Sequence, residues 1–190
     1  MASLKSYLYG AAPILGLTGA TLYERQRALV NMGVLEAAPG RGPGSGVPLT
    51  AYNIAAVIIA LLATETITEM DERVIALINA PPFFDPVKDH DEWVKAGRPT
   101  FCTSAAAILG GNDLPWPLKR RVKEMGVYRR PWRGFLKSRT GGEATYGAKM
   151  KGSESPRIEI TAALDFLVLR DLAVFTQGAL SQAKEEEDEE

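Results

Sequence analysis

The chain has little of the chemistry that marks disulfide-linked, metal-binding or membrane-spanning proteins. Its 190 residues contain one cysteine, Cys102, and one histidine, His90. A lone cysteine excludes an intramolecular disulfide, and one cysteine with one distant histidine is too few for a structural zinc site. The most apolar run, residues 54–63, is about half as long as a bilayer-spanning helix. These absences predict a cytoplasmic protein that needs no metal and no cofactor.

Enzyme motifs are also missing. The glycine-rich segment GRGPGSG (40–46) fits neither the dinucleotide fingerprint nor the P-loop pattern. His90 stands in the polar segment KDHDEW (88–93) with no nucleophile motif beside it, and SQAK (181–184) matches S-x-x-K without the partner motifs. Carboxylate pairs at helical spacing in an apolar setting are absent as well. We therefore expect a protein that is not an enzyme.

Charge is unevenly distributed along a chain whose net charge is only −1. The last six residues, EEEDEE, are all acidic; once they are removed from the 23 acidic residues, 22 basic residues face 17 acidic ones. Like charges repel, and this segment offers no apolar side chain to bury. The sequence thus predicts a mildly basic body and a disordered acidic tail over 181–190.

The first 65 residues carry the pattern of two short helices joined by a tight turn. Apolar side chains recur at the spacing of one helix face at Leu8, Ala11, Ala12 and Leu15. Gly16 then suits a helix C-cap, and Thr18 suits the N-cap of a second helix that ends near Gly33. The segment therefore predicts a helix-turn-helix.

A glycine-rich loop follows the second predicted helix. Residues 34–37 and 47–49 are able to form an outgoing and a return strand around GRGPGSG, and Thr50 can cap an apolar helix over 51–63. A wing at a DNA backbone, a phosphate cradle and a solvated loop are the three interpretations of this loop. The order of elements favours the wing, in which Arg41 supplies a charge for a phosphate or the minor groove.

This order of elements resembles bacterial winged helix-turn-helix regulators. The pattern that carries the resemblance consists of Leu8, Ala11, Ala12, Gly16, Leu17, Thr18, Thr21, Leu22, Arg25, Leu29, Gly33, Val34 and Leu35. A helix directly after the wing is similar to the arrangement in MerR-like regulators and in phage small terminase subunits. The resemblance covers about residues 3–65.

The resemblance implies a sequence-specific transcriptional regulator of bacterial, prophage or gene-transfer-agent type. Such a protein binds double-stranded DNA as a homodimer at the nucleoid, reads the major groove with the helix over 18–32, and contacts RNA polymerase or an architectural DNA-bending protein. The residues implied in DNA contact are Thr18, Gly19, Thr21, Tyr23, Glu24, Arg25, Gln26, Arg27, Arg41 and Ser45. A bracing role for Arg25, a packaging role like that of small terminases, and a protein-binding winged helix stay open.

A basic strip between Lys119 and Arg139 predicts a second nucleic-acid or partner surface. It contains nine basic residues, a single acidic one, and three interleaved aromatic rings. Basic residues mixed with aromatics are typical of surfaces that bind nucleic acid. The candidates are Lys119, Arg120, Arg121, Lys123, Arg129, Arg130, Trp132 and Arg133. Contact with the acidic tail, and a solvated face whose aromatics pack inward, are the alternatives.

The expected fold class is α+β, with four segments. Residues 1–65 form the winged helix-turn-helix, 66–99 an acidic helix and proline-rich connector, 100–180 an α+β domain with the basic strip, and 181–190 the disordered tail. Within the third segment, residues 138–150 predict a hairpin, RIEI (157–160) a further strand, and residues 163–175 a helix.

Overall fold

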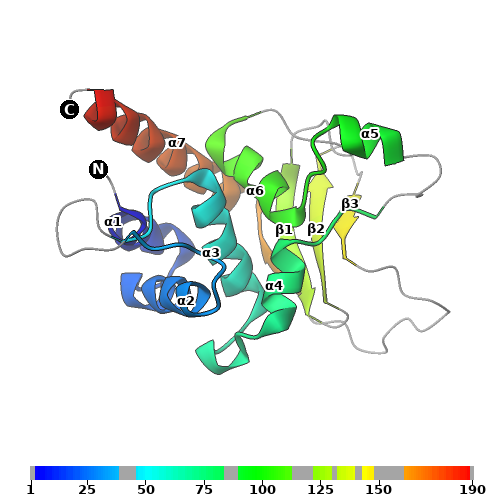
Figure 1. Cartoon of the computed structure of the whole chain (residues 1–190), viewed down its shortest axis with the longest axis horizontal. Coiled ribbons are helices and arrows are strands. Elements are labelled where there is room, and N and C mark those ends of the chain that lie inside the picture. The colour runs from blue at the N-terminus through cyan, green and yellow to red at the C-terminus, as the bar shows by residue number, and fades with distance from the viewer. Residues whose placement is uncertain are drawn as a thin grey trace.

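A computed structural model describes residues 3–38, 46–83, 90–112, 122–129, 132–139, 143–147 and 161–188. The fold is α+β, with a helix-rich N-terminal part and a four-stranded antiparallel sheet in the order β3-β2-β1-β4 (Figure 1). The helices are α1 (Leu4–Ala11), α2 (Gly19–Asn31), α3 (Ala51–Ala63), α4 (Glu72–Ile78), α5 (His90–Lys95), α6 (Phe101–Gly110) and α7 (Phe166–Asp188). Short 3₁₀ helices, η1 (Ala12–Leu15) and η2 (Ile67–Glu69), follow α1 and α3, and the strands are β1 (Val122–Arg129), β2 (Trp132–Ser138), β3 (Glu143–Tyr146) and β4 (Thr161–Leu164).

The predicted helix boundaries around the turn are confirmed. Gly16 ends η1 in the left-handed conformation with a φ of 66°, and the Thr18 hydroxyl accepts a hydrogen bond from the Thr21 amide at 3.3 Å. Thr50 caps α3 in the same way, through the Asn53 amide at 3.1 Å. The first helix differs from the prediction, because Pro13 cannot donate an amide hydrogen and the last turn becomes the 3₁₀ helix η1.

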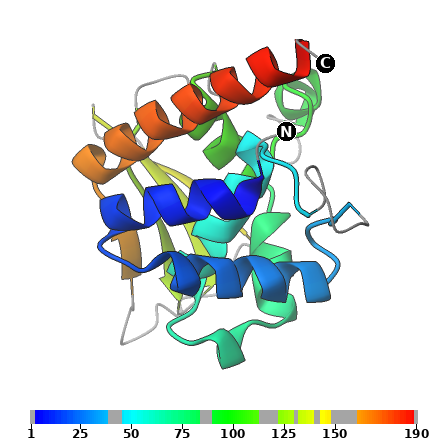
Figure 2. The ribbon, with the colours of Figure 1, turned by 90° about the vertical axis from the view of Figure 1, so that its left-hand side faces the viewer.

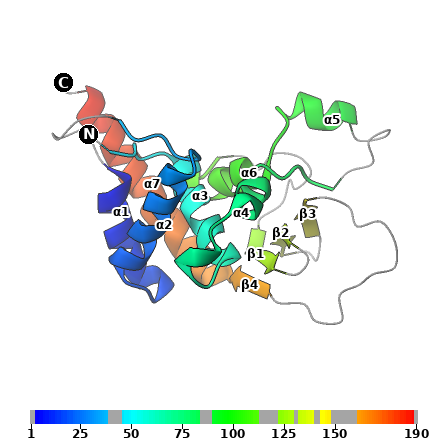
Figure 3. The same ribbon diagram turned by 60° about the horizontal axis from the view of Figure 1, so that its bottom comes forward.

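Helix α3 lies at the centre of the molecule. Nine of its residues are buried, including every residue from Ile54 to Ala60. Helices α1 and α2 lie on one side of α3, and the sheet lies on the other (Figures 1 and 3). The buried apolar residues form one cluster that extends from Leu4 to Leu172. The core therefore crosses the boundary that the sequence placed between residues 65 and 100.

The sheet turns one face to the helices. Tyr146 and Gly134, which are neighbours in register on β3 and β2, both contact α6, where Tyr146 donates to Ser104 at 3.0 Å. A Cβ at Gly134 would lie 2.5 Å from the Phe101 ring, so a glycine is required at this close approach. A hairpin is present as the β2–β3 pair, but its first strand lies before the predicted range of 138–150 and shares only Ser138 with it. RIEI lies outside the described residues, and β4 follows it directly.

The C-terminal helix returns to the start of the chain. In Figure 2, α7 runs alongside α1, and the Tyr7 hydroxyl lies 2.7 Å from that of Thr176. The prediction of a disordered tail from residue 181 is wrong for Ser181–Asp188, which form the last turns of α7. Half-buried apolar side chains continue along this helix as far as Ala179 and Leu180, so its acidic end continues a helix that is already held by packing.

Candidate nucleic-acid interface

Helix α2 presents a narrow exposed face along its length. Ala20, Glu24, Arg27 and Asn31 are exposed and follow one another at spacings of four, three and four residues. Thr18 is exposed at the N-cap, whereas Gly19, Thr21 and Tyr23 are half-buried. Of the ten residues that the resemblance implied in DNA contact, this face contains Glu24 and Arg27. Thr18, Gly19, Thr21 and Tyr23 lie beside it at the start of the 13-residue helix.

Contacts with α1 fix the angle at which α2 begins. Gly19 packs directly against the ring and backbone of Tyr9, where any side chain would collide. The Lys5 ammonium lies 4.8 Å from the centroid of the Tyr23 ring. Lys5 of α1 therefore adds a positive charge beside the α2 face. The sequence alone did not indicate that Lys5 lies next to α2.

Two of the implied DNA-contact residues are buried and unavailable to DNA. Arg25 is 5% exposed, and its guanidinium donates to the backbone oxygens of Thr21, Thr64 and Glu65 at 3.3, 3.4 and 3.1 Å. Gln26 is 6% exposed, and its Oε1 has no hydrogen-bond partner among the described residues. This burial does not agree with a DNA contact for either side chain, and the three backbone contacts favour the bracing role for Arg25. Burial lowers the pKa of the Arg25 guanidinium, while the nearby Glu24 carboxylate acts in the opposite direction.

Arg129, assigned to the basic strip, is also structural. Its Nε donates to the Leu62 backbone oxygen at 2.9 Å, and its guanidinium pairs with the Glu65 carboxylate at 2.6 Å. The side chain is 17% exposed and sits at the carboxyl end of α3, where a cation is favoured by the helix dipole. Arg129 thus ties β1 to α3 and contributes little to an outer surface.

After α2, the segment that the sequence predicted as a wing is bounded by a single pair of residues. Ala38 and Gly46 exchange two backbone hydrogen bonds of 3.0 and 3.2 Å, and Ser3 forms a bridge with Pro48. The prediction of paired strands over 34–37 and 47–49 is wrong, because residues 34–37 form no bridge and Pro48 pairs with Ser3. Arg41 and Ser45, the implied wing contacts, lie outside the described residues.

The described residues of the basic strip lie on both faces of the sheet. Arg129 and its register partner Trp132 face the helices, and the Arg73 guanidinium of α4 lies 4.9 Å from the Trp132 ring centroid. Arg133 faces the other way and lies 5.3 Å from the Tyr128 ring centroid. Lys123 is exposed. Lys119, Arg120, Arg121 and Arg130 lie outside the described residues.

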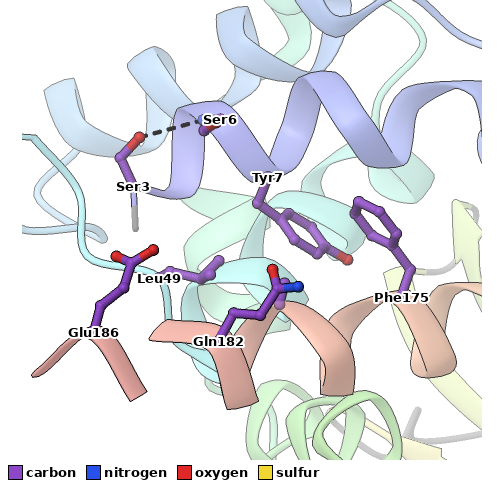
Figure 4. Close-up of a pocket in the computed structure, with 8 residues that line it drawn as sticks. Ser3, Ser6, Tyr7, Leu49, Phe175, Gln182 and Glu186 are labelled. Carbon is purple, nitrogen blue, oxygen red and sulfur yellow. Dashed lines mark hydrogen bonds between the residues drawn. The ribbon is translucent and has the colours of Figure 1, made fainter. Parts of the chain in front are cut away.

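An open cavity of about 440 Å³ lies between α1 and the end of α7 (Figure 4). Its lining combines hydroxyl, amide and carboxylate groups with apolar side chains, from Ser3, Ser6, Tyr7, Leu49, Phe175, Ala179, Gln182 and Glu186. Burial raises the pKa of the Tyr7 phenol to about 12, although the hydrogen bond to Thr176 partly opposes this. The phenol therefore stays protonated at neutral pH and is not a base.

Other reactive groups lie apart from one another. Cys102 is buried in α6, and burial raises the pKa of its thiol, which makes it a poor nucleophile. Among the described residues no group of three or more His, Cys, Asp or Glu side chains could hold a metal ion. Within the same part of the chain, no helix is both long and apolar enough to cross a membrane.

The chain matches no protein-family model, no curated protein and no solved structure in the comparisons. A functional assignment therefore depends on the geometry and chemistry of its own residues.

Proposed function

We propose that the protein binds duplex DNA sequence-specifically through the exposed face of α2 and regulates transcription. The observation that carries the proposal is the exposed stripe of α2 that contains Glu24 and Arg27, held at a fixed angle by the close Gly19–Tyr9 contact. A recognition helix needs an accessible face near its N-terminus and a rigid attachment, and this stripe has both.

The side chains of this face suit the major groove. An arginine such as Arg27 can donate two hydrogen bonds to one guanine, and a carboxylate such as Glu24 can accept from a cytosine amino group. Lys5 beside Tyr23 and the amides at the start of α2 are placed to approach phosphates. In the proposal, the exposed side chains of α2 contact the bases, while Lys5 and the first amides of α2 contact the DNA phosphates.

The proposal includes a homodimer at the nucleoid. A dimer that places two copies of α2 one helical turn of DNA apart would read two half-sites. A regulator of this kind would also contact RNA polymerase or an architectural DNA-bending protein.

Selection from pooled genomic fragments tests this function. Purified protein is mixed with the fragments at about 0.15 M salt, a salt range in which specific affinities are commonly compared, and the bound fraction is sequenced. We expect a few defined sites to be enriched, and the enrichment to disappear with Arg27→Ala but not with the exposed control Lys95→Ala of α5. Uniform recovery of fragments by the wild-type protein would contradict sequence-specific regulation.

A further inference from the structure

Positive charge is concentrated in the segment that builds most of the sheet. Residues 119–160 contain 12 Lys and Arg side chains but only 4 Asp and Glu, a balance of +8. The rest of the chain contains 10 basic and 19 acidic residues, a balance of −9. A protein whose net charge is −1 is thus divided into a cationic sheet segment and an anionic remainder.

Strand β2 directs its charged side chains to one face. Gly134, Leu136 and Ser138 alternate along the strand and are buried. Arg133, Phe135, Lys137 and Arg139 alternate with these residues and point to the opposite face, where Phe135 is itself fully buried, Lys137 is 30% exposed and Arg139 is exposed. This face therefore holds three cations, each beside a different aromatic ring: Arg133 beside Tyr128, Lys137 beside Phe135 and Arg139 beside Phe166.

Aromatic rings hold these cations in position. The Lys137 ammonium lies 4.4 Å from the Phe135 ring centroid, and the Arg139 guanidinium lies 3.8 Å from that of Phe166. Lys123 stands at the irregularity in register between Val122 and Glu124, at the end of β1 that pairs with Ser138 and Lys137. Lys123, Lys137 and Arg139 therefore gather at one end of the β1–β2 pair.

Two acidic side chains within the described part of the chain make contacts on this face of the sheet. Glu124 pairs with Lys137 at 3.4 Å, and Glu143 accepts a hydrogen bond from Tyr128 at 3.2 Å. The acidic turns Glu185–Asp188 lie at the far end of α7, which extends about 34 Å at the usual rise per residue. In Figures 1 and 3 that end lies on the opposite side of the molecule from the sheet.

We infer that the outward face of β2, together with Lys123, contacts the phosphate backbone of a second segment of duplex DNA. Cations spaced along a strand suit a polyanion, and the contact needs no base readout. Because α2 and the sheet lie on opposite sides of α3, one straight duplex does not reach both surfaces. The protein therefore bridges two duplexes, an inference that rests on the proposed function for the first of them.

Two matched triple variants test this surface. Lys123→Gln/Lys137→Gln/Arg139→Gln removes three charges from the sheet, and Arg73→Gln/Lys95→Gln/Lys184→Gln removes three exposed charges elsewhere. On a random duplex, we expect only the sheet triple to make the plot of log affinity against log salt shallower. The slope should fall by about 1 for each phosphate that is no longer neutralised. Equal changes in both triples would overturn the inference, since net charge alone would then explain binding.

A capture assay tests bridging itself. One duplex is immobilised, protein is added, and recovery of a labelled second duplex is measured. We expect wild type and the control triple to recover the second duplex and the sheet triple to lose most of it. Recovery that survives in the sheet triple, as in a dimer bridging through two copies of α2, would overturn the inference, as would no recovery with wild type.

A gain-of-charge variant covers the case in which the sheet triple does not fold. Glu124→Gln/Glu143→Gln removes the two acidic groups and should tighten binding to the random duplex at low salt, whereas an unchanged affinity contradicts the inference. Arg27→Ala separates the two proposals. It should abolish site preference and leave binding to the random duplex intact. Site preference therefore tests the proposed function, and binding to the random duplex tests the sheet surface separately.

Discussion

Arg25 and Arg129 reach the same end of α3 from opposite sides. Arg25 donates to the Thr64 and Glu65 backbone oxygens, while Arg129 donates to the Leu62 backbone oxygen and pairs with the Glu65 carboxylate. The last backbone oxygens of a helix have no partner within the helix, so these guanidinium groups satisfy some of them. The two arginines thereby join α2 to β1 through α3.

Replacing Arg25 should destabilise the fold. Arg25→Ala removes three hydrogen bonds from a charged donor, including the one to the buried Thr64 backbone oxygen, so we expect a loss of about 2–4 kcal/mol in the free energy of unfolding. The neighbouring exposed residue gives the control, since Arg27→Ala should change stability by less than about 0.5 kcal/mol. Urea denaturation measures both. A wild-type midpoint for Arg25→Ala would show that the residue braces nothing.

Replacing Gln26, unlike replacing Arg25, should not destabilise the fold. Its Oε1 is buried without a partner among the described residues, so the amide loses hydration on folding and gains nothing at that atom. Gln26→Leu should therefore be neutral or stabilising by up to about 1 kcal/mol, and it should leave DNA affinity unchanged. Thermal unfolding and a binding titration check the two expectations. A loss of DNA affinity with normal stability would mean that Gln26 does contact DNA.

Two glycines should respond to alanine with opposite signs. In Gly134→Ala, the new Cβ would lie 2.5 Å from the ring of Phe101, which is fully buried, so we expect destabilisation of about 1–3 kcal/mol. Gly178 lies within α7 with no atom within 4 Å of its Cβ position, so Gly178→Ala should stabilise by about 0.5–1 kcal/mol. Denaturant titrations compare the pair. Similar effects of both would contradict the packing of β2 on α6.

Stability should fall at alkaline pH because two tyrosines are buried. Burial raises the pKa of the Tyr7 and Tyr146 phenols to about 12, against 10.0 for a free side chain. The folded state therefore holds more protons than the unfolded state between these values, and its stability decreases as the pH rises from 10 to 12. A shift of this size corresponds to about 2–3 kcal/mol for each group.

The double variant Tyr7→Phe/Tyr146→Phe isolates this effect. It loses two hydrogen bonds, one to Thr176 and one to Ser104, and should be less stable than wild type at about pH 8. Between pH 10 and 12, the free energy of unfolding of the double variant should decrease less than that of wild type. An equally steep decline in both proteins would assign the alkaline loss to other groups.

Local signals in the sequence were sufficient for three of the helix boundaries. Gly16, Thr18 and Thr50 act through their own backbone and side-chain geometry, which depends little on the rest of the chain. The buried face of α2 was also encoded, because Leu22, Arg25, Gln26 and Leu29 follow the spacing of one helix face. The polarity of Arg25 and Gln26 concealed this face, since their burial depends on the end of α3.

The basic strip could not be divided between surfaces from sequence. Alternation along β2 assigns residues to two faces but does not say which face is covered by helices. That depends on α3, α4 and α6, which place Arg129 and Trp132 inward and leave Arg133 outward. The helical end of α7 was missed for a related reason, because packing of α7 against α1 and α6 outweighs the repulsion within EEED.

Base recognition by Arg27 is the central claim, and one titration tests it most directly. The fluorescence anisotropy of a labelled duplex that carries an enriched site is compared with that of a scrambled duplex, for wild type and Arg27→Ala. We predict that the variant loses about 1–3 kcal/mol of affinity for the enriched site and keeps the wild-type affinity for the scrambled duplex. Equal weakening on both duplexes would contradict the account, since Arg27 would then contact only the backbone.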